Sequence, residues 1–293
     1  MSRNILLLLD GTCQNITGQI PTTIGNLELK ITNNNFQQTK YTQGIATFPN
    51  NKLGVSFGTK LDKLTVYPNL DYLDQIGLTS DDKLSIVGYS RGGESAKRII
   101  QHLDKNNVKI ESFIALEAVD ITKHLPITNL LGINLNKPTN LENVKEIIHY
   151  KTLNESRPAY MTSNIVGDNV QNIWVPTNHT RLGGARANFL YSRELSYLLL
   201  DEISQILQTQ GFEFSQGLQF EVNCDKLVDL EKTHLFKRYK IPKKEDKYHI
   251  MIKKNLENPQ YQIKNPHITF NDIEDNQFVK LNPITKKYTQ IKE

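Results

Sequence analysis

The chain has few cysteines and no long apolar run. Its 293 residues include two cysteines, Cys13 and Cys224, and no Cys/His pair has the spacing of a zinc site. These absences argue against a disulfide framework and against structural zinc. The longest apolar run, residues 5–9, stops at Asp10. It is far shorter than the roughly 18–20 residues of a membrane-spanning helix, and too short for the core of a Sec-type signal peptide.

The chain also lacks a strong excess of charge. Its 35 Lys and Arg residues exceed its 31 Asp and Glu residues by only four. So small and dispersed an excess does not indicate nucleic-acid binding, and we expect no nucleic-acid partner. The length allows one large domain or two small ones.

Buried strands alternate with helical segments along the first two thirds of the chain. Apolar runs predict strands at residues 5–9, 84–88, 110–119 and 172–175. Apolar spacing predicts helices in the latter part of 61–76, after residue 93, at 141–150 and at 189–207. Residues 15–51 are rich in Asn, Thr, Gln and Gly and are interpreted as a long loop with short pieces of structure. This alternation predicts an α/β domain with a mostly parallel sheet flanked by helices.

The composition changes near residue 211. We therefore expect one large α/β domain over 1–212. Residues 213–293 should form a C-terminal extension or small domain that is α+β or β-rich. The second part contains lysine-rich patches and scattered proline. Two interpretations stay open for it, a solvated basic surface and a surface that contacts an anionic partner or a membrane.

The sharpest local signal is Gly-Tyr-Ser-Arg-Gly at residues 88–92, between a predicted strand and a predicted helix. Such a tight turn, here called the elbow, lifts the central serine, Ser90, above the end of the strand. Gly88 and Gly92 lack the side chains that would collide in this turn. The helix N-terminus favours a developing oxyanion, and the Arg91 N–H is the natural first donor to it. The alternative is a glycine-rich turn with a packing serine.

A nucleophilic serine needs an orienting acid, and three carboxylates are candidates for that role. Asp120 ends the strand predicted after the elbow helix, where a histidine could bridge it to Ser90. A turn or helix cap is its alternative role. Glu117, placed inside that strand, and Asp168, in a Gly-Asp-Asn turn, are weaker candidates.

Three histidines compete for the role of base. His179 follows the strand at 172–175 and precedes two glycines, a loop position suited to a base. His124 and His149 are the alternatives. His102 lies within the elbow helix and points away from the loops.

Six sequence blocks occur in a recognisable order. They are Asp-Gly-Thr at 10–12, Tyr-Thr-Gln-Gly-Ile-Ala-Thr at 41–47, Gly-Tyr-Ser-Arg-Gly-Gly at 88–93, Val-Asp-Ile at 119–121, Glu-Ser-Arg at 155–157, and Trp-Val-Pro-Thr-Asn-His-Thr-Arg-Leu-Gly-Gly at 174–184. The series, over about residues 4–212, resembles the type VI secretion lipase-effector-like α/β hydrolase family. The resemblance implies an α/β-hydrolase fold and a Ser–Asp–His hydrolase, with phospholipase activity in characterised members.

Carried over position by position, the resemblance makes Ser90 the nucleophile, Asp120 the acid and His179 the base. The loop after the first strand should supply the second oxyanion donor, from Gly11 or Thr12. Residues Asp10, Arg181 and Gly183 become candidates for the loops that face the substrate.

The sequence departs from the family in those same loops. The family's Asp two residues after the histidine is Arg181 here, and its third glycine is Ala185. These changes put the substrate in question more than the reaction class.

The sequence thus predicts a serine esterase that acts on lipid or phospholipid acyl esters without a metal or organic cofactor. A hydrolase of small soluble esters and a non-catalytic hydrolase-like binding or effector module are the alternatives. Without a Sec-type signal, cytoplasmic residence and export as an effector by a specialised secretion system fit equally well.

Overall fold

A single parallel sheet organises the protein in its computed structural model. The structure describes residues 2–14, 16, 21–45, 61–119, 139–152, 162–163, 165–175, 179–184, 192–215, 279–281 and 288–290. Six strands form the sheet in the order β2-β1-β3-β4-β6-β8, with every neighbouring pair parallel. Their bounds are β1 (Asn4–Leu9), β2 (Gln37–Thr42), β3 (Lys83–Tyr89), β4 (Ile110–Leu116), β6 (Val144–Thr152) and β8 (Val170–Val175).

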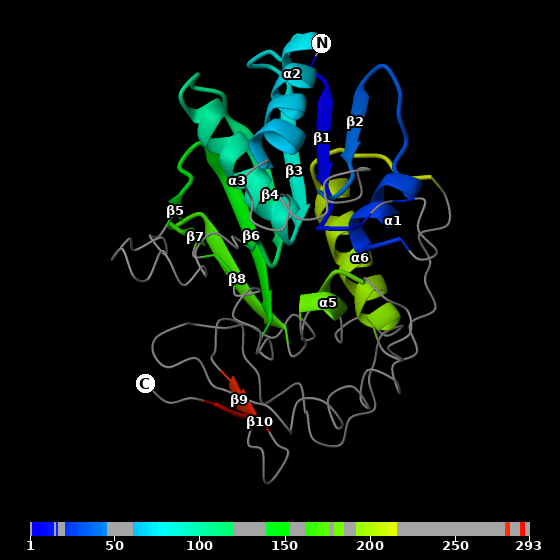
Figure 1. Cartoon of the computed structure of the whole chain (residues 1–293), viewed down its shortest axis with the longest axis vertical. Coiled ribbons are helices and arrows are strands. Elements are labelled where there is room, and N and C mark those ends of the chain that lie inside the picture. The colour runs from blue at the N-terminus through cyan, green and yellow to red at the C-terminus, as the bar shows by residue number, and fades with distance from the viewer. Residues whose placement is uncertain are drawn as a thin grey trace.

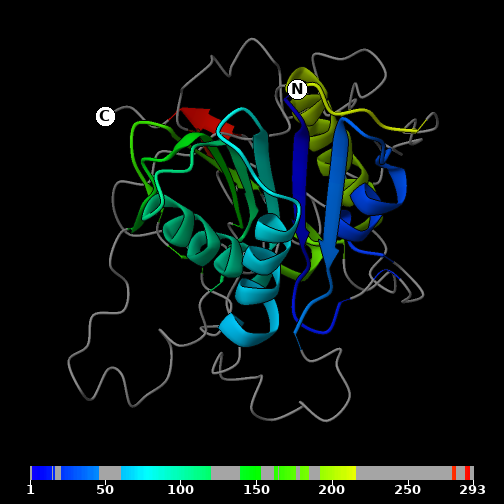
Figure 2. The same cartoon turned by 90° about the horizontal axis from the view of Figure 1, so that it is seen from above.

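Helices cover both faces of this sheet (Figures 1 and 2). On one face lie the π-helix η1 (Asp62–Val66), α2 (Tyr67–Gln75) and α3 (Arg91–Asp104). On the other lie α1 (Thr23–Lys30), α5 (His179–Leu182) and α6 (Ser192–Thr209). The predicted α/β class, a mostly parallel sheet flanked by helices, is confirmed. No described helix is long and apolar enough to cross a membrane.

Two apolar cores sit on the two sides of the sheet, and the alternation of β1 shows why. Its residues Ile5, Leu7 and Leu9 pack in the core of α2 and α3, whereas Leu6 and Leu8 pack in the core of α1 and α6. A strand buried on both faces needs an unbroken apolar run, because successive side chains point to opposite sides. The apolar run at residues 5–9 was therefore interpreted correctly as a buried strand.

The helix predicted at residues 141–150 was wrong, because this segment enters the sheet as β6 between β4 and β8. Ile147 packs on the side of α3, and Ile148 and Tyr150 pack on the side of α6. A strand buried on both faces has no polar alternation, so a short apolar pattern of this kind fits either structure. The sheet decides the conformation, since β6 forms parallel ladders with both neighbours.

The segment predicted as a long loop, residues 15–51, contains α1 and the edge strand β2. The Thr22 hydroxyl caps α1 by accepting the N–H of Gly25 at 3.0 Å. Strand β2 is polar, Gln-Gln-Thr-Lys-Tyr-Thr, and its residues are half-buried after the first. An edge strand needs no apolar run, which explains why the sequence pattern did not reveal it.

Two short strand pairs complete the described structure. Strands β5 (Thr139–Asn140) and β7 (Ile165–Val166) pair in parallel, and β9 (Val279–Leu281) and β10 (Tyr288–Gln290) pair antiparallel. Beyond residue 212, the chain still bonds to the first part of the molecule, since Ser215 N–H donates to the carbonyl of Lys30 at 2.7 Å.

Candidate active site

Polar residues gather where the strands end. Asp10 follows β1, Ser90 follows β3 and Glu117 follows β4. Because the strands are parallel and adjacent, these three positions lie at the same edge of the sheet. Helix α5, which begins with His179, lies at this edge (Figure 1).

The backbone at Ser90 has the strained conformation that the sequence motif predicts. Its φ of 57° and ψ of −120° lie in a region that residues other than glycine rarely adopt. Its N–H donates to the carbonyl of Leu116 at 2.9 Å, and its carbonyl accepts from Val119 N–H at 3.0 Å. These bonds to the neighbouring strand hold the turn in place, as strain at a functional position requires.

The elbow glycines allow backbones to touch. A Cβ on Gly92 would lie 2.0 Å from the carbonyl oxygen of Leu9, and a Cβ on Gly88 would lie 2.7 Å from the Cα of Gly93. Any side chain at either position would push α3 away from the sheet. The predicted backbone role of both glycines agrees with this packing.

His179 and Ser90 meet directly. His179 Nε2 lies 2.8 Å from Ser90 Oγ, although the two residues are 89 positions apart in the chain. Both side chains are buried, with 3% and 4% of the residue surface exposed. A neutral imidazole in the Nδ1–H tautomer accepts the serine hydroxyl proton at Nε2, the arrangement of a general base and its nucleophile.

The carboxylate that contacts the other ring nitrogen is Glu117. Its Oε2 lies 3.2 Å from His179 Nδ1, while its Oε1 accepts hydrogen bonds from the hydroxyl of Thr152 and, at 3.4 Å, from the Thr152 N–H. From its sequence position alone, Glu117 is a weaker candidate for the acid than Asp120. Asp120 lies outside the described residues, so the acid role given to it stays a prediction.

Glu117 reaches the histidine because the chain turns at this residue. The predicted strand ran to residue 119, but β4 ends at Leu116 and Glu117 has a φ of +46°. Phe113 and Ala115 pack toward α3, so regular alternation would send Glu117 to that side too. The left-handed turn places it against His179 instead. Its position as the first acidic residue after an apolar run, like Asp10, was the available sequence signal.

Two of the competing candidates lie elsewhere in the fold. His149 is fully buried on β6, where its Nε2 lies 3.0 Å from the hydroxyl of Thr162. Burial first, and then the charges of Lys151 and Lys97, lower the pKa of His149 well below its usual value. Asp168 precedes β8 and therefore lies at the opposite edge of the parallel sheet from Ser90. The third competitor, at position 124, falls outside the described residues.

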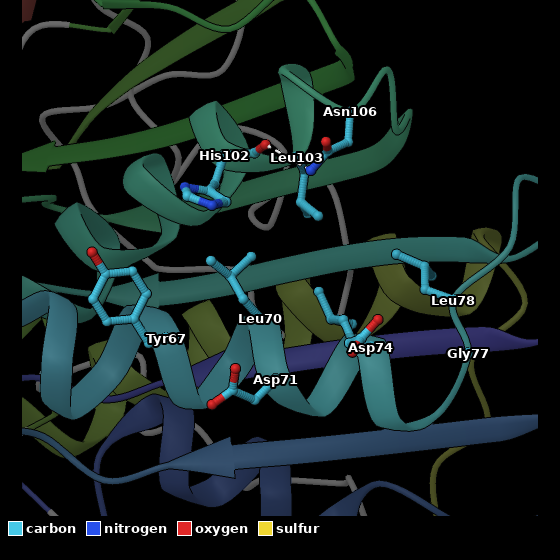
Figure 3. A pocket seen from close by; sticks show the side chains of 10 residues that line it. Tyr67, Leu70, Asp71, Asp74, Gly77, Leu78, His102, Leu103 and Asn106 are labelled. Carbon is cyan, nitrogen blue, oxygen red and sulfur yellow. Dashed lines mark hydrogen bonds between the residues drawn. The ribbon is translucent and has the colours of Figure 1, made fainter.

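A pocket of about 390 Å³ lies between α2 and α3, away from Ser90 (Figure 3). It is lined by Asp71 and Asp74 from α2, by His102 from α3 and by Asn106, which follows α3. His102 lies twelve positions after Ser90, which corresponds to about 18 Å along the helix axis. The expectation that His102 points away from the catalytic loops therefore agrees with the structure.

The loop after β1 passes beside the serine, where a second oxyanion donor was predicted. A Cβ on Gly11 would lie 3.2 Å from Ser90 Cβ. Gly11 N–H donates to Asp10 Oδ1 at 2.7 Å. In the described part of the chain, Thr12 N–H has no acceptor, so of the two predicted donors Thr12 is the one that can serve an oxyanion. The Arg91 N–H belongs to the first turn of α3, and such groups point toward the helix N-terminus.

Asp10 ties this loop to two other elements. Besides Gly11 N–H, its carboxylate accepts the hydroxyl of Thr22 at 2.8 Å and that of Tyr41 at 2.7 Å. Burial raises the pKa of Asp10 to about 6, although the three hydrogen bonds act in the other direction. The contacts of Asp10 are with its own loop, the α1 cap and β2, and its role as a substrate-loop residue stays a prediction.

Replacing Asp10 by asparagine should change the pH dependence of stability. The folded pKa of about 6 exceeds the ordinary value of 3.8, so the protonated carboxyl stabilises the fold at low pH. That contribution, about 3 kcal/mol, is lost as the pH rises through 6. Relative to wild type, the free energy of unfolding of Asp10→Asn should therefore rise between pH 4 and 7. Urea titrations at several pH values measure it, and a constant difference would contradict the assignment.

The remaining predicted loop residues are buried. Arg181 is the third residue of α5, and both its side chain and that of Arg91 are shielded from solvent. A Cβ on Gly183 would lie 2.0 Å from the ring of Tyr89. Gly183 thus lets α5 approach the elbow. Among the described residues, no cluster of His, Cys, Asp and Glu has the geometry to hold a metal ion.

Comparison with known proteins gives similarity in fold only. No protein-family model matches the sequence, and no curated protein matches it. Several of the solved structures that it resembles are described as hydrolases or thioesterases. Mouse alpha/beta hydrolase domain-containing protein 10 is 11% identical, with a TM-score of 0.43 over 72% of this chain and 92% of that one. A pyrethroid hydrolase from Sphingobium faniae is 13% identical, with a TM-score of 0.40 over 71% and 98%. The RedJ thioesterase of Streptomyces coelicolor is 13% identical, with a TM-score of 0.38 over 70% and 85%. Similarity at this level assigns no activity to this chain.

Proposed function

We propose that the protein is a serine hydrolase that cleaves carboxylic esters, with Ser90 as nucleophile, His179 as base and Glu117 as the orienting acid. The observation that carries the proposal is the 2.8 Å contact between Ser90 Oγ and His179 Nε2 at a strained strand-to-helix turn. A packing serine needs neither the strain nor the histidine.

The reaction follows from the contacts of these three residues. Ser90 Oγ attacks the ester carbonyl carbon while His179 Nε2 takes the hydroxyl proton. The carboxylate of Glu117 holds the Nδ1–H tautomer and stabilises the imidazolium. Backbone N–H groups of Arg91 and Thr12 stabilise the tetrahedral oxyanion. His179 then protonates the leaving alcohol, and water, deprotonated by His179, releases the acyl group from Ser90.

For the substrate we propose a lipid or phospholipid acyl ester. The resemblance to the type VI secretion lipase-effector-like family supports this class. The basic segment beyond residue 212, of which the structure describes 213–215, β9 and β10, is proposed as a membrane contact.

A fluorophosphonate probe tests the nucleophile. We expect it to label Ser90 at neutral pH, because the probe reacts with a serine activated by a neighbouring base. Mass spectrometry of the digested protein locates the label, and His179→Ala should prevent it. An unlabelled Ser90 in wild type would favour a non-catalytic binding or effector module.

Product analysis tests the substrate. The protein is incubated with mixed phospholipid vesicles, and the released fatty acids and lysophospholipids are measured by mass spectrometry beside Ser90→Ala. A lipase should act faster on vesicles than on the same ester below its solubility limit. Hydrolysis restricted to short soluble esters would identify a small-ester hydrolase instead.

A further inference from the structure

Tyr89, the residue before the serine, makes two contacts with His179 that the proposed reaction has not used. Its ring centroid lies 5.1 Å from that of the imidazole, with 27° between the ring planes. Its hydroxyl donates to the backbone carbonyl of His179 at 3.0 Å. Tyr89 is the last residue of β3 and only 3% exposed, so both contacts are made inside the protein.

Two glycines fix the position of the Tyr89 ring. A Cβ on Gly183 would lie 2.0 Å from its Cζ, and a Cβ on Gly11 would lie 2.6 Å from its Cδ1. The ring thus contacts the backbone of the segment that carries the base and the backbone of the loop after β1. These close approaches on two segments restrict the ring to its place beside the imidazole.

The stack matters because the charge of the imidazole changes during the reaction. The face of an aromatic ring is electronegative, and it attracts a cation within about 6 Å of its centroid. When His179 takes the serine proton, its ring becomes positive while Tyr89 stays in place. Other groups beside the imidazole include the Glu117 carboxylate and the Ser90 hydroxyl, and Arg181 lies two residues further along α5.

We infer that Tyr89 is a positioning residue for the base: its ring favours the imidazolium form of His179, and its hydroxyl fastens the first residue of α5 to the elbow. The inference rests on the proposed function for its role in catalysis. The ring contact and the hydrogen bond make separate contributions, and two substitutions can separate them.

The test replaces Tyr89 with two other residues that keep an aromatic ring at this position. Tyr89→Phe removes the hydroxyl, and Tyr89→pentafluorophenylalanine also withdraws electron density from the ring face. The titration of His179 is followed by NMR of the ¹⁵N-labelled imidazole in both variants and in wild type. We expect the fluorinated variant to lower the pKa of His179 by about half to one pH unit relative to Tyr89→Phe, as the weakening of a buried cation–π contact implies.

Activity measurements on the same variants complete the test. In the fluorinated variant, the acidic limb of kcat/KM should move to lower pH by the same amount, whereas Tyr89→Phe should lower kcat less than about tenfold and leave KM unchanged. Equal His179 titration in the two variants would overturn the inference, because a merely structural ring does not distinguish them. The NMR titration needs no turnover. A wild-type protein without esterase activity but with the shifted titration would therefore reject the proposed function and leave the ring contact standing.

Discussion

Ser90→Ala should lower turnover of a short-chain p-nitrophenyl ester by several orders of magnitude, toward the factor of about 10⁶ seen when a triad serine is lost. The expectation follows from geometry, because Ser90 Oγ is the hydroxyl within hydrogen-bond distance of His179 Nε2. Removing Oγ removes the atom that forms the acyl-enzyme. Initial rates of p-nitrophenol release at neutral pH measure the loss.

A matched control is available at Ser80, an exposed serine in the turn between α2 and β3. Ser80→Ala should keep the wild-type rate, and circular dichroism should show that both variants are folded. A folded Ser90→Ala protein with an unchanged rate would remove the nucleophile assignment and with it the proposed mechanism.

Glu117→Gln should lower kcat by about 10⁴, as when a triad carboxylate becomes an amide. The amide can keep the hydrogen bond from Thr152 but presents an N–H to His179 Nδ1. The histidine then adopts the other tautomer and can no longer accept the Ser90 proton at Nε2. Steady-state kinetics on the same ester should show the loss in kcat, with KM little changed.

Asp120→Asn is the matched comparison, because the resemblance assigns the acid role to Asp120 and the contacts of His179 assign it to Glu117. We expect Asp120→Asn to lose much less activity than Glu117→Gln, because Glu117 is the carboxylate in contact with His179 Nδ1. A large loss in Asp120→Asn with a small one in Glu117→Gln would reverse the assignment of the acid.

Prediction of the fold succeeded where burial imposes a simple pattern. The apolar runs before Asp10 and Ser90 are strands because both of their faces are covered by helices. The amphipathic pattern after Gly93 continues α3, whose apolar face packs on the sheet. Prediction failed at β6, because a strand buried on both faces and a buried helix can share the same apolar sequence pattern. It also failed at the polar edge strand β2.

The candidate site divides in the same way. The motif around Ser90 could be predicted because a strained turn requires glycine at fixed positions. The glycines after His179 indicated a place where the chain approaches another segment closely. The contact of Glu117 with His179 could not be predicted from the sequence, because the direction of the Glu117 side chain depends on one backbone angle. Alternation along β4 would turn Glu117 toward α3, and only the positive φ at that residue turns it toward the histidine.

By itself, the sequence determined that strands and helices alternate and that a serine stands at a tight turn between them, because local sterics and burial leave their mark on neighbouring residues. Only the tertiary structure shows that His179 contacts Ser90 and that Glu117 contacts His179. The first contact joins residues that are 89 positions apart in the chain, and the second joins residues that are 62 positions apart. Both contacts depend on the strand order and on the turn at the end of β4. A linear pattern carries no record of either.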